Sequence, residues 1–197
     1  MTRVASCLLL LLALTTKAAA QDCTASLQGP DALWASLPID SAQPGAPLRT
    51  LAFLRCLGCG LDLSVQLAAG AAAPALQSMP IGRLSGRAWA QAVVDDPAQR
   101  EGFLQSVLRS ESRTSPGCTL EGRVAGIAEL GGFGMIRTEI QAECASQPAL
   151  LAGEFYSGYD GRCQYQLQAI WGPGFQALSP QGRYALQSLL SSVRIGR

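Results

Sequence analysis

The chain has 197 residues, of which 48% are hydrophobic and 15% are charged, a composition typical of globular rather than disordered proteins. It carries 15 Lys and Arg and 14 Asp and Glu, so its formal net charge is +1. It contains no histidine, which excludes Ser-His-Asp and Cys-His catalysis within the chain. The arginines are scattered singly from Arg49 to Arg197, without the basic stretch of a nucleic-acid-binding protein, so we expect no nucleic-acid partner.

Residues 1–20 are predicted to be a cleaved signal peptide. Arg3 gives a positive start, the apolar run at 8–14 is too short to span a bilayer, and the alanines at 18–20 suit a signal peptidase. We therefore expect cleavage before Gln21 and export to the periplasm or the extracellular space. No later segment has 18 uninterrupted apolar residues, so the mature chain is not expected to span a membrane.

Cleavage would also change the chemistry that is available to the chain. Arg3 and Lys17 leave with the leader, and the mature chain then has 13 basic residues, all arginine, against 14 acidic ones. Without histidine or lysine it lacks the commonest general base, the usual Schiff-base nucleophile and the lysine of a phosphate-binding loop. Lipidation of Cys23 is disfavoured because the acidic Asp22 stands next to it.

The first third of the mature chain predicts an arm, two strands and a loop. Residues 21–47 are rich in Pro, Gly, Ser and Asp and are expected to form an irregular N-terminal arm. Strands are expected at 48–56 and 61–67, and the second alternates apolar with polar side chains. Residues 68–86 show no periodicity and are expected to form a surface loop.

Two helices are predicted next. Helical spacing begins near Arg87 and breaks at Asp95-Asp96-Pro97, where an aspartate cap followed by proline predicts the start of a new helix. This second helix is expected to run from Pro97 to about Ser110, with an apolar stripe that covers a sheet, and to end in a turn at 112–117. Capping explains the acidic doublet better than a pair of catalytic carboxylates does.

Two long strands at 118–130 and 133–144 are predicted to form a hairpin, since the glycine-rich Gly131-Gly132-Phe133-Gly134 between them is typical of a turn. Apolar residues occupy even positions in both strands, namely Cys118, Leu120, Val124, Ala128 and Leu130 in the first and Ile136, Ile140, Ala142 and Cys144 in the second. Residues of like parity must then pair to keep these faces together. Cys118 then lies opposite Cys144, and we predict a cross-strand disulfide. A bulge that shifts the register would give Cys144 another partner.

A further hairpin is expected from strands at 151–157 and 163–171, which flank the turn signal Asp160-Gly161. In its second strand glutamines at 164, 166 and 168 alternate with apolar residues. This alternation indicates that one face of the strand is exposed to solvent.

The chain is expected to close with a helix that Ser179 caps and Pro180 begins, with Arg194 and Arg197 near its C-terminal end. The order of six strands and two principal helices predicts a single domain over residues 48–197. Its class is α+β: a mostly antiparallel sheet, covered by the helices and stabilised by disulfides.

This element order, with the terminal helix at 184–194 after the last strand, resembles the PsbP-like group. The resemblance implies a small, non-enzymatic binding or assembly-support protein. It carries over no functional residue.

Six cysteines remain after cleavage: Cys23, Cys56, Cys59, Cys118, Cys144 and Cys163. An even number in an exported chain predicts three disulfides. Besides Cys118 with Cys144, we favour Cys56 with Cys59, which would close a turn, and Cys23 with Cys163, which would tie the arm to the domain. The alternative pairs one of Cys56 and Cys59 with Cys23 and the other with Cys163.

Cys56 and Cys59 also have the C-x-x-C spacing of a thiol-disulfide oxidoreductase, but such a site needs its first cysteine at a helix N-terminus, and a strand is expected here. No second closely spaced cysteine pair completes a zinc site, so we expect no metal or cofactor. Glu139, Glu143 and Glu154 alternate with apolar residues, as on a solvated sheet face. With no catalytic constellation, the sequence predicts a non-enzymatic protein.

The leading hypothesis is therefore an exported module that binds another exported or envelope protein, as an accessory subunit, an assembly factor or an inhibitor. One alternative is an oxidoreductase that uses Cys56 and Cys59, and another is a binder of a small apolar ligand between sheet and helix. Phe155, Tyr156 and Tyr159, together with residues 68–86, are the candidate interface, because loops and tyrosines are favoured at interfaces. Ordinary hairpin packing is the alternative explanation for the aromatic residues.

Overall fold

The computed structural model describes residues 23–27, 32–39, 48–59, 62–115, 117–145, 150–172 and 178–196, so the predicted signal peptide lies outside the described residues. The strands are β1 (Ala25–Leu27), β2 (Trp34–Ser36), β3 (Arg49–Cys56), β4 (Ser64–Ala71), β5 (Cys118–Leu130), β6 (Phe133–Cys144), β7 (Leu150–Tyr159), β8 (Cys163–Trp171) and β9 (Val193–Ile195). The helices are α1 (Pro74–Ser78), the 3-10 helix η1 (Pro80–Arg83), α2 (Gly86–Asp95), α3 (Pro97–Thr114) and α4 (Pro180–Ser191).

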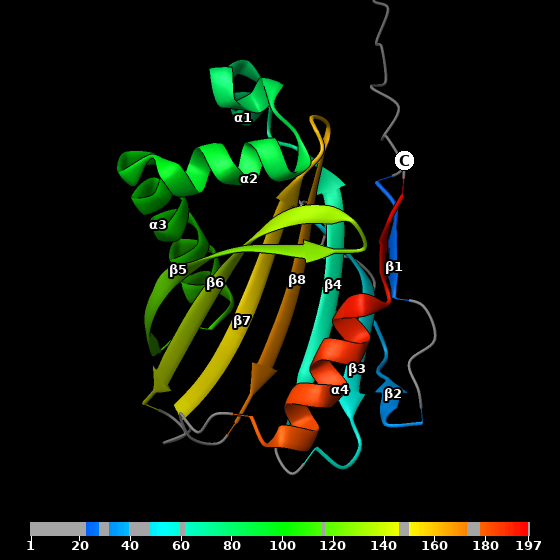
Figure 1. Cartoon of the computed structure of the whole chain (residues 1–197). Helices are drawn as coiled ribbons and strands as arrows, with labels where there is room; N and C mark the ends of the chain where they lie inside the picture. The colour runs from blue at the N-terminus through cyan, green and yellow to red at the C-terminus, as the bar shows by residue number, and fades with distance from the viewer. Residues whose placement is uncertain are drawn as a thin grey trace, which may run out of the picture.

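A seven-stranded antiparallel sheet forms the body of the protein, in the order β2-β3-β4-β8-β7-β6-β5 (Figure 1). The predicted α+β class with a mostly antiparallel, disulfide-stabilised sheet is confirmed. The sheet has one strand more than expected because β2 pairs with β3 at its edge, and β1 pairs with β9 in a separate two-stranded sheet. The predicted arm is thus not irregular where the structure describes it.

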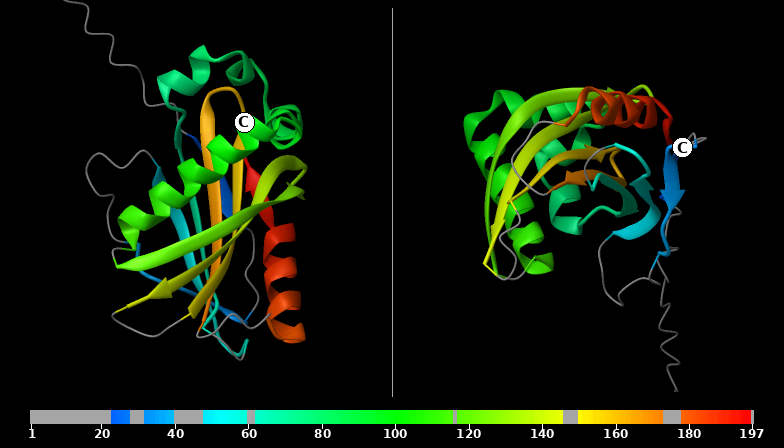
Figure 2. Two further views of the ribbon diagram at one scale, coloured as in Figure 1. Left: turned by 90° about the vertical axis from the view of Figure 1, so that its left-hand side faces the viewer. Right: turned by 90° about the horizontal axis from the view of Figure 1, so that it is seen from below.

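Helices lie on both faces of the sheet, with α2 and α3 on one face and α4 on the other (Figure 2). The α4 face contains the largest core cluster, in which Leu186 and Leu189 pack with buried residues of β4 and β8 such as Leu67 and Leu167. The opposite face has two smaller clusters, one around Trp89 of α2 and one around Val107 of α3. Helix α3 covers the face of β8 that carries the glutamines, because Gln166 and Gln168 bond Glu111 of α3.

The β5–β6 hairpin has the predicted bounds and places Cys118 opposite Cys144. A bulge is also present, between Val124 and Gly126, but it lies on the turn side of the cysteine pair. From Cys118 to Val124, even-numbered residues of β5 therefore pair with even-numbered residues of β6. Beyond the bulge they pair with odd-numbered residues, as Ala128 does with Met135, and they point to the opposite face of the sheet. The expected single parity for the whole of β5 was wrong for this reason.

Residues 68–86 were expected to form a loop, and the structure differs. The alanine-rich residues 68–71 complete β4, since small buried side chains give a central strand no polar alternation. Pro74 and Pro80 then stand at the first positions of α1 and η1, where a missing backbone N–H is tolerated.

Three further boundaries differ from the sequence predictions. Helix α3 runs to Thr114 rather than Ser110, β4 starts at Ser64 rather than at Leu61, and α4 ends at Ser191. Arg194, expected on that helix, lies in β9, and Arg197 is outside the described residues. No described helix combines the length and hydrophobicity that a membrane crossing requires.

Candidate functional site: a cleft between α3 and the sheet

A cap made of α1, η1 and α2 is fixed over the end of the β7–β8 hairpin by one buried tyrosine. The hydroxyl of Tyr159, whose side chain has no solvent exposure, lies 2.9 Å from the carbonyl oxygens of Gly82 and Gly161, which share its single hydrogen as acceptors. Trp89 of α2 packs edge-on against Tyr159 and against Phe103 of α3, with ring centroids 5.8 and 6.1 Å apart. The cap and α3 are thereby held as neighbours on one face of the sheet.

Helix α3 turns a stripe of mostly small residues toward the space beneath this cap. The stripe is Gln99, Gly102, Phe103, Ser106, Val107 and Ser110, which follow the spacing of three and four residues of one helix face. A cleft of about 590 Å³ lies along it. Since a Cβ built on Gly102 would have no atom within 4 Å, the helix leaves this space open.

The lining of the cleft is apolar on the side of the cap, and it is polar along the sheet and at Gln99, Ser106 and Ser110 of α3. Ser157 of β7 and Gln164 and Gln166 of β8 provide the polar floor. The apolar wall consists of Leu48, Leu76, Met79, Ile81, Trp89, Val93, Phe103 and Val107. The cleft therefore has the mixed lining of a site for a mainly apolar molecule.

A second hollow, of about 240 Å³, continues the cleft past the end of its apolar wall, and Leu48, Ser110 and Gln166 line both spaces. Glu111 of α3 lies in this second hollow, although only 9% of the residue is exposed. Its Oε1 accepts hydrogen bonds from the side-chain amides of Gln168 at 3.0 Å and Gln166 at 3.4 Å. The glutamine face of β8, expected to be fully solvated, is thus partly covered by α3.

Burial raises the pKa of the Glu111 carboxyl above its ordinary value, while the hydrogen bonds from Gln166 and Gln168 act in the opposite direction. Among the described residues that line the cleft and its continuation, Glu111 is the only charged one. The site is therefore electrostatically negative at one end and neutral elsewhere.

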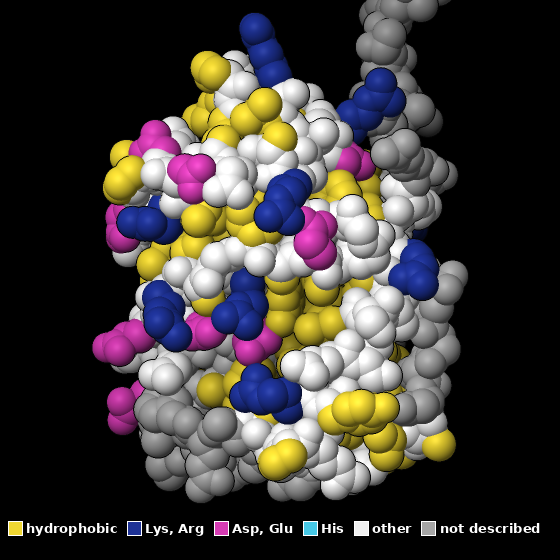
Figure 3. Space-filling model, viewed as in Figure 1, with side chains coloured by type: hydrophobic (Ala, Val, Ile, Leu, Met, Phe, Trp, Pro, Cys, Tyr) yellow, Lys and Arg dark blue, Asp and Glu magenta, His cyan; other side chains and the backbone are white. Residues whose placement is uncertain are grey.

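The opposite face of the sheet has a hollow of different character, about 400 Å³, between α4 and strands β5 to β7. Figure 3 shows apolar surface at this place with basic side chains around it. Arg137, Arg183, Glu154 and Tyr156 contribute its polar lining. Burial, and secondly the hydrogen bond to Glu154, raise the pKa of Tyr156, so its hydroxyl remains a donor.

The charged side chains of this face form hydrogen-bonded ion pairs with one another. Glu139 accepts from Arg123 at 2.8 Å and from Arg137 at 3.3 Å, and it lies across from Glu154 in the sheet. Glu139 and Glu154 are half-buried, whereas Glu143 is exposed. The predicted solvated face of glutamates is therefore only partly solvated, and the carboxylates of Glu139 and Glu154 accept hydrogen bonds from neighbouring side chains of the sheet.

Cys56 and Cys59 are joined to each other at the turn between β3 and β4, and both are buried, with 6% and 2% of each residue exposed. Strand β4 follows them, and the backbone N–H of Leu57 donates to the carbonyl of Leu33. The carbonyl of Cys59 accepts from the hydroxyl of Ser179, the cap residue of α4. A reactive cysteine needs access to its substrate, so this buried arrangement favours a structural disulfide over a catalytic one.

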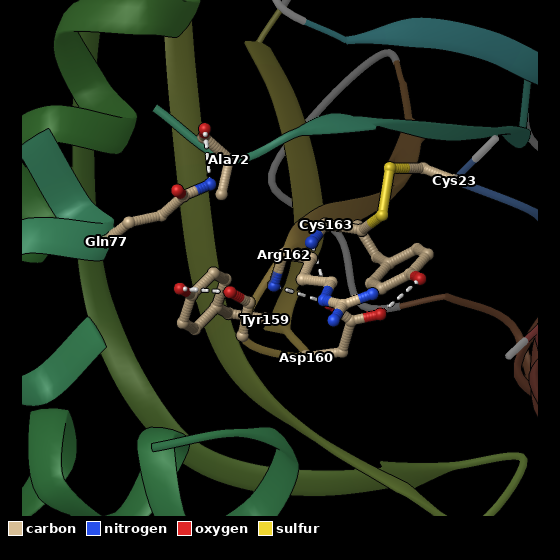
Figure 4. The surroundings of a disulfide bond; sticks show 9 residues. Cys23, Ala72, Gln77, Tyr159, Asp160, Arg162 and Cys163 are labelled. Carbon is tan, nitrogen blue, oxygen red and sulfur yellow. Dashed lines mark hydrogen bonds between the residues drawn. A yellow bond between two sulfur atoms is a disulfide. The ribbon is translucent and has the colours of Figure 1, made fainter. Parts of the chain in front are cut away.

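A second disulfide, Cys23–Cys163, joins the N-terminal segment to the start of β8 (Figure 4). Beside it, the carboxylate of Asp160 accepts from the backbone N–H groups of Arg162 and Cys163 and from the hydroxyl of Tyr165. Together with Cys118–Cys144, these are the three pairs that the sequence favoured. The alternative pairings of Cys56 and Cys59 are not those of this structure.

The aromatic residues considered for an interface lie inside the fold. Phe155 and Tyr156 are each 3% exposed and Tyr159 is fully buried. This burial agrees with the alternative explanation, in which the three residues serve ordinary hairpin packing. Phe155 faces α3, Tyr156 faces α4 and Tyr159 holds the cap. In the described part of the chain, no group of three or more acidic, cysteine or histidine side chains is arranged to hold a metal ion.

The sequence matches no protein-family model and no curated protein. Among solved structures, the chain is similar to the crystal structure of LpqN of Mycobacterium tuberculosis, which is described as involved in cell envelope biogenesis. The identity is 17% and the TM-score 0.41, with 88% of this chain and 84% of LpqN covered.

Proposed function

We propose that this protein is an exported module that binds a small, mainly apolar ligand in the cleft between α3 and the sheet. The supporting observation is the cleft itself, because its volume of about 590 Å³ falls within the range of roughly 300–1,000 Å³ that is usual for ligand sites. An apolar wall with a few polar groups on one side suits such a ligand. This is the small-ligand hypothesis of the sequence, which the geometry supports over the others.

The three disulfides support the exported part of the proposal. Disulfides form and persist outside the cytosol, and here they join segments as far as 140 residues apart. A binding protein that works outside the cell gains a fixed scaffold from these bonds.

The test uses the mature protein and the neutral fluorescent probe N-phenyl-1-naphthylamine, whose emission rises when it enters an apolar site. We expect saturable binding by the wild type. The variant Gly102→Leu places a side chain in the open space of the cleft and replaces a helix glycine by a better helix former. It should abolish binding and retain the fold.

The matched control is Ser112→Leu, which adds the same side chain to an exposed position of α3 away from the cleft. This variant should bind the probe like the wild type. Equal binding by Gly102→Leu and the wild type would show that the probe binds elsewhere and would contradict the proposal.

A role as a protein-binding accessory module is the second candidate, and one observation favours it. Met79 and Leu84 are 50% and 37% exposed and lie together with Ile81 on the surface of the cap, at and next to η1. Apolar side chains gathered on a surface are typical of a contact site. Chemical crosslinking in the native host should yield a defined partner that Met79→Ser and Leu84→Ser together abolish.

A further inference from the structure

The chemical class of the ligand follows from the charge of the cleft, provided that the cleft binds a ligand as proposed above. We infer that the ligand is a cationic amphiphile, an apolar chain ending in an ammonium group that Glu111 holds. The apolar chain lies along α3 beneath the cap, and the ammonium group enters the hollow where the helix meets the β8 glutamines.

The first argument is the absence of positive charge at the site. No arginine is found among the described residues that line the cleft or its continuation, and Glu111 is the one charged residue there. A fatty acid or a phosphate-bearing lipid would bring a second negative charge to a half-enclosed site in which none of the described lining residues is a cation. Buried like charges are strongly unfavourable, whereas a buried charge with an opposite partner is tolerated.

The second argument is the hydrogen-bonding capacity around Glu111. An ammonium group has three donors and no acceptor. The carboxylate of Glu111, held against the sheet by Gln166 and Gln168, accepts several hydrogen bonds, and the amide oxygens of the two glutamines are further acceptors. Thr50 and Gln66, which also line this hollow, are hydrogen-bonded to each other at 2.7 Å.

The third argument is the length of the site. Phe103, at the apolar end, and Glu111 are eight residues apart on one continuous helix. At 1.5 Å per residue the distance along the helix axis is about 12 Å. The cleft therefore matches an apolar chain of about ten carbon atoms with a compact polar group at one end.

The raised pKa of Glu111 agrees with binding of a cation. Burial disfavours the charged carboxylate and raises its pKa. A bound cation restores a favourable environment for that charge, so ligand and carboxylate stabilise each other.

The experiment compares three molecules with the same chain and different ends: decylamine, decanol and decanoate. Each displaces the naphthylamine probe from the mature protein at neutral pH, below its micelle concentration. We expect decylamine to bind at least tenfold more tightly than decanol, a difference of ~1.4 kcal/mol, and decanoate to bind most weakly. Tighter binding of decanoate than of decylamine would overturn the inference.

Two variants assign the preference to this carboxylate. Glu111→Gln keeps the shape and removes the charge, so it should lower the affinity for decylamine to that of decanol and leave decanol unchanged. Ser110→Arg adds a positive charge at an exposed position that lines both spaces, and it should reverse the order of decylamine and decanoate. If Glu111→Gln does not fold, Ser110→Arg alone decides, because an unchanged order in that variant refutes a role for local charge.

The results separate the two proposals. If the neutral probe and decanol bind, and Gly102→Leu blocks both, the cleft is a ligand site whatever the head-group order is. A missing preference for the amine then refutes only the inference about Glu111. If neither the probe nor any of the three molecules binds the wild type, the proposed function itself fails.

Discussion

Removal of the Cys23–Cys163 disulfide tests how the fold is stabilised. This bond closes 140 residues of chain, whereas Cys118–Cys144 closes 26 and Cys56–Cys59 closes 3. A disulfide stabilises mainly by limiting the freedom of the unfolded chain, and the effect grows with the length of the closed loop. The double variant Cys23→Ala, Cys163→Ala should therefore be the least stable of the three possible double variants.

The loop lengths set the expected size of each effect. Chain entropy gives about 5 kcal/mol for the loop of 140 residues and about 3.5 kcal/mol for the loop of 26. The loop of 3 residues gives only about 1.6 kcal/mol. Alanine is the suitable replacement because Cys23 and Cys163 are 5% and 6% exposed, and a serine hydroxyl there would need a hydrogen-bond partner.

The assay is equilibrium unfolding in urea, followed by tryptophan fluorescence, for the wild type and the three double variants under identical oxidising conditions. Loss of Cys23–Cys163 should give the lowest midpoint. It should also raise the slope of the transition, because the unfolded chain expands when its longest loop opens. If the variant without Cys56–Cys59 loses as much stability as the variant without Cys23–Cys163, loop entropy does not govern these bonds and the reasoning is wrong.

Three further outcomes are expected from the same unfolding assay. Asp96→Ala should cost about 1 kcal/mol, since the Asp96 carboxylate accepts from the backbone N–H groups of Ala98 at 2.8 Å and Gln99 at 3.2 Å; an unchanged midpoint would contradict this capping role. Thr138→Val should stabilise the protein by about 1 kcal/mol, because the Thr138 hydroxyl is fully buried without a hydrogen-bond partner among the described residues; destabilisation would show that the hydroxyl is bonded. The raised pKa of Glu111 means that the folded state binds its proton more tightly than the unfolded state, so stability should fall as pH rises from about 4.5 through the folded pKa. Glu111→Gln should remove that part of the pH dependence, and an unaltered profile would exclude Glu111 as its source.

The parts of the fold that the sequence predicted best are those with local signals. In the β5–β6 hairpin, strand alternation and a glycine turn gave the bounds, and parity gave the pairing of Cys118 with Cys144. The Asp96 cap and the Ser179 cap were predictable because each side chain bonds a backbone N–H two or three residues further along the chain. Such interactions need no knowledge of tertiary structure.

The elements that were not predicted depend on distant partners. Strands β1 and β2 are three residues long and exist because β9 and β3 lie beside them. The bulge near Gly126 adds one residue to β5, and nothing local in the sequence distinguishes this glycine from Gly122, the other glycine of the strand. Residues 68–71 look aperiodic because β4 lies in the middle of the sheet, between β3 and β8.

The candidate site was only partly visible in the sequence. The alternation of glutamines at 164, 166 and 168 was recognised, but it was interpreted as a solvated face, because nothing local shows that α3 crosses that face. Glu111 was not singled out, since a glutamate near the end of an amphipathic helix is usually exposed. The small residues Gly102 and Ser106 on the inner side of α3 were the available signal for a cleft.

The bond between Cys23 and Cys163 has a consequence for how the protein is made. On the export route proposed above, the N-terminus of the chain is delivered first, so Cys23 enters the oxidising compartment together with Cys56 and Cys59 long before Cys163 arrives. Cys56–Cys59 can form at once, but until β8 has been delivered any disulfide of Cys23 is non-native and must later be corrected by thiol-disulfide exchange. Maturation of this protein should then depend on a disulfide isomerase of its compartment, and the dependence should weaken when Cys56 and Cys59 are both replaced by alanine, because two of the four wrong partners of Cys23 are then removed.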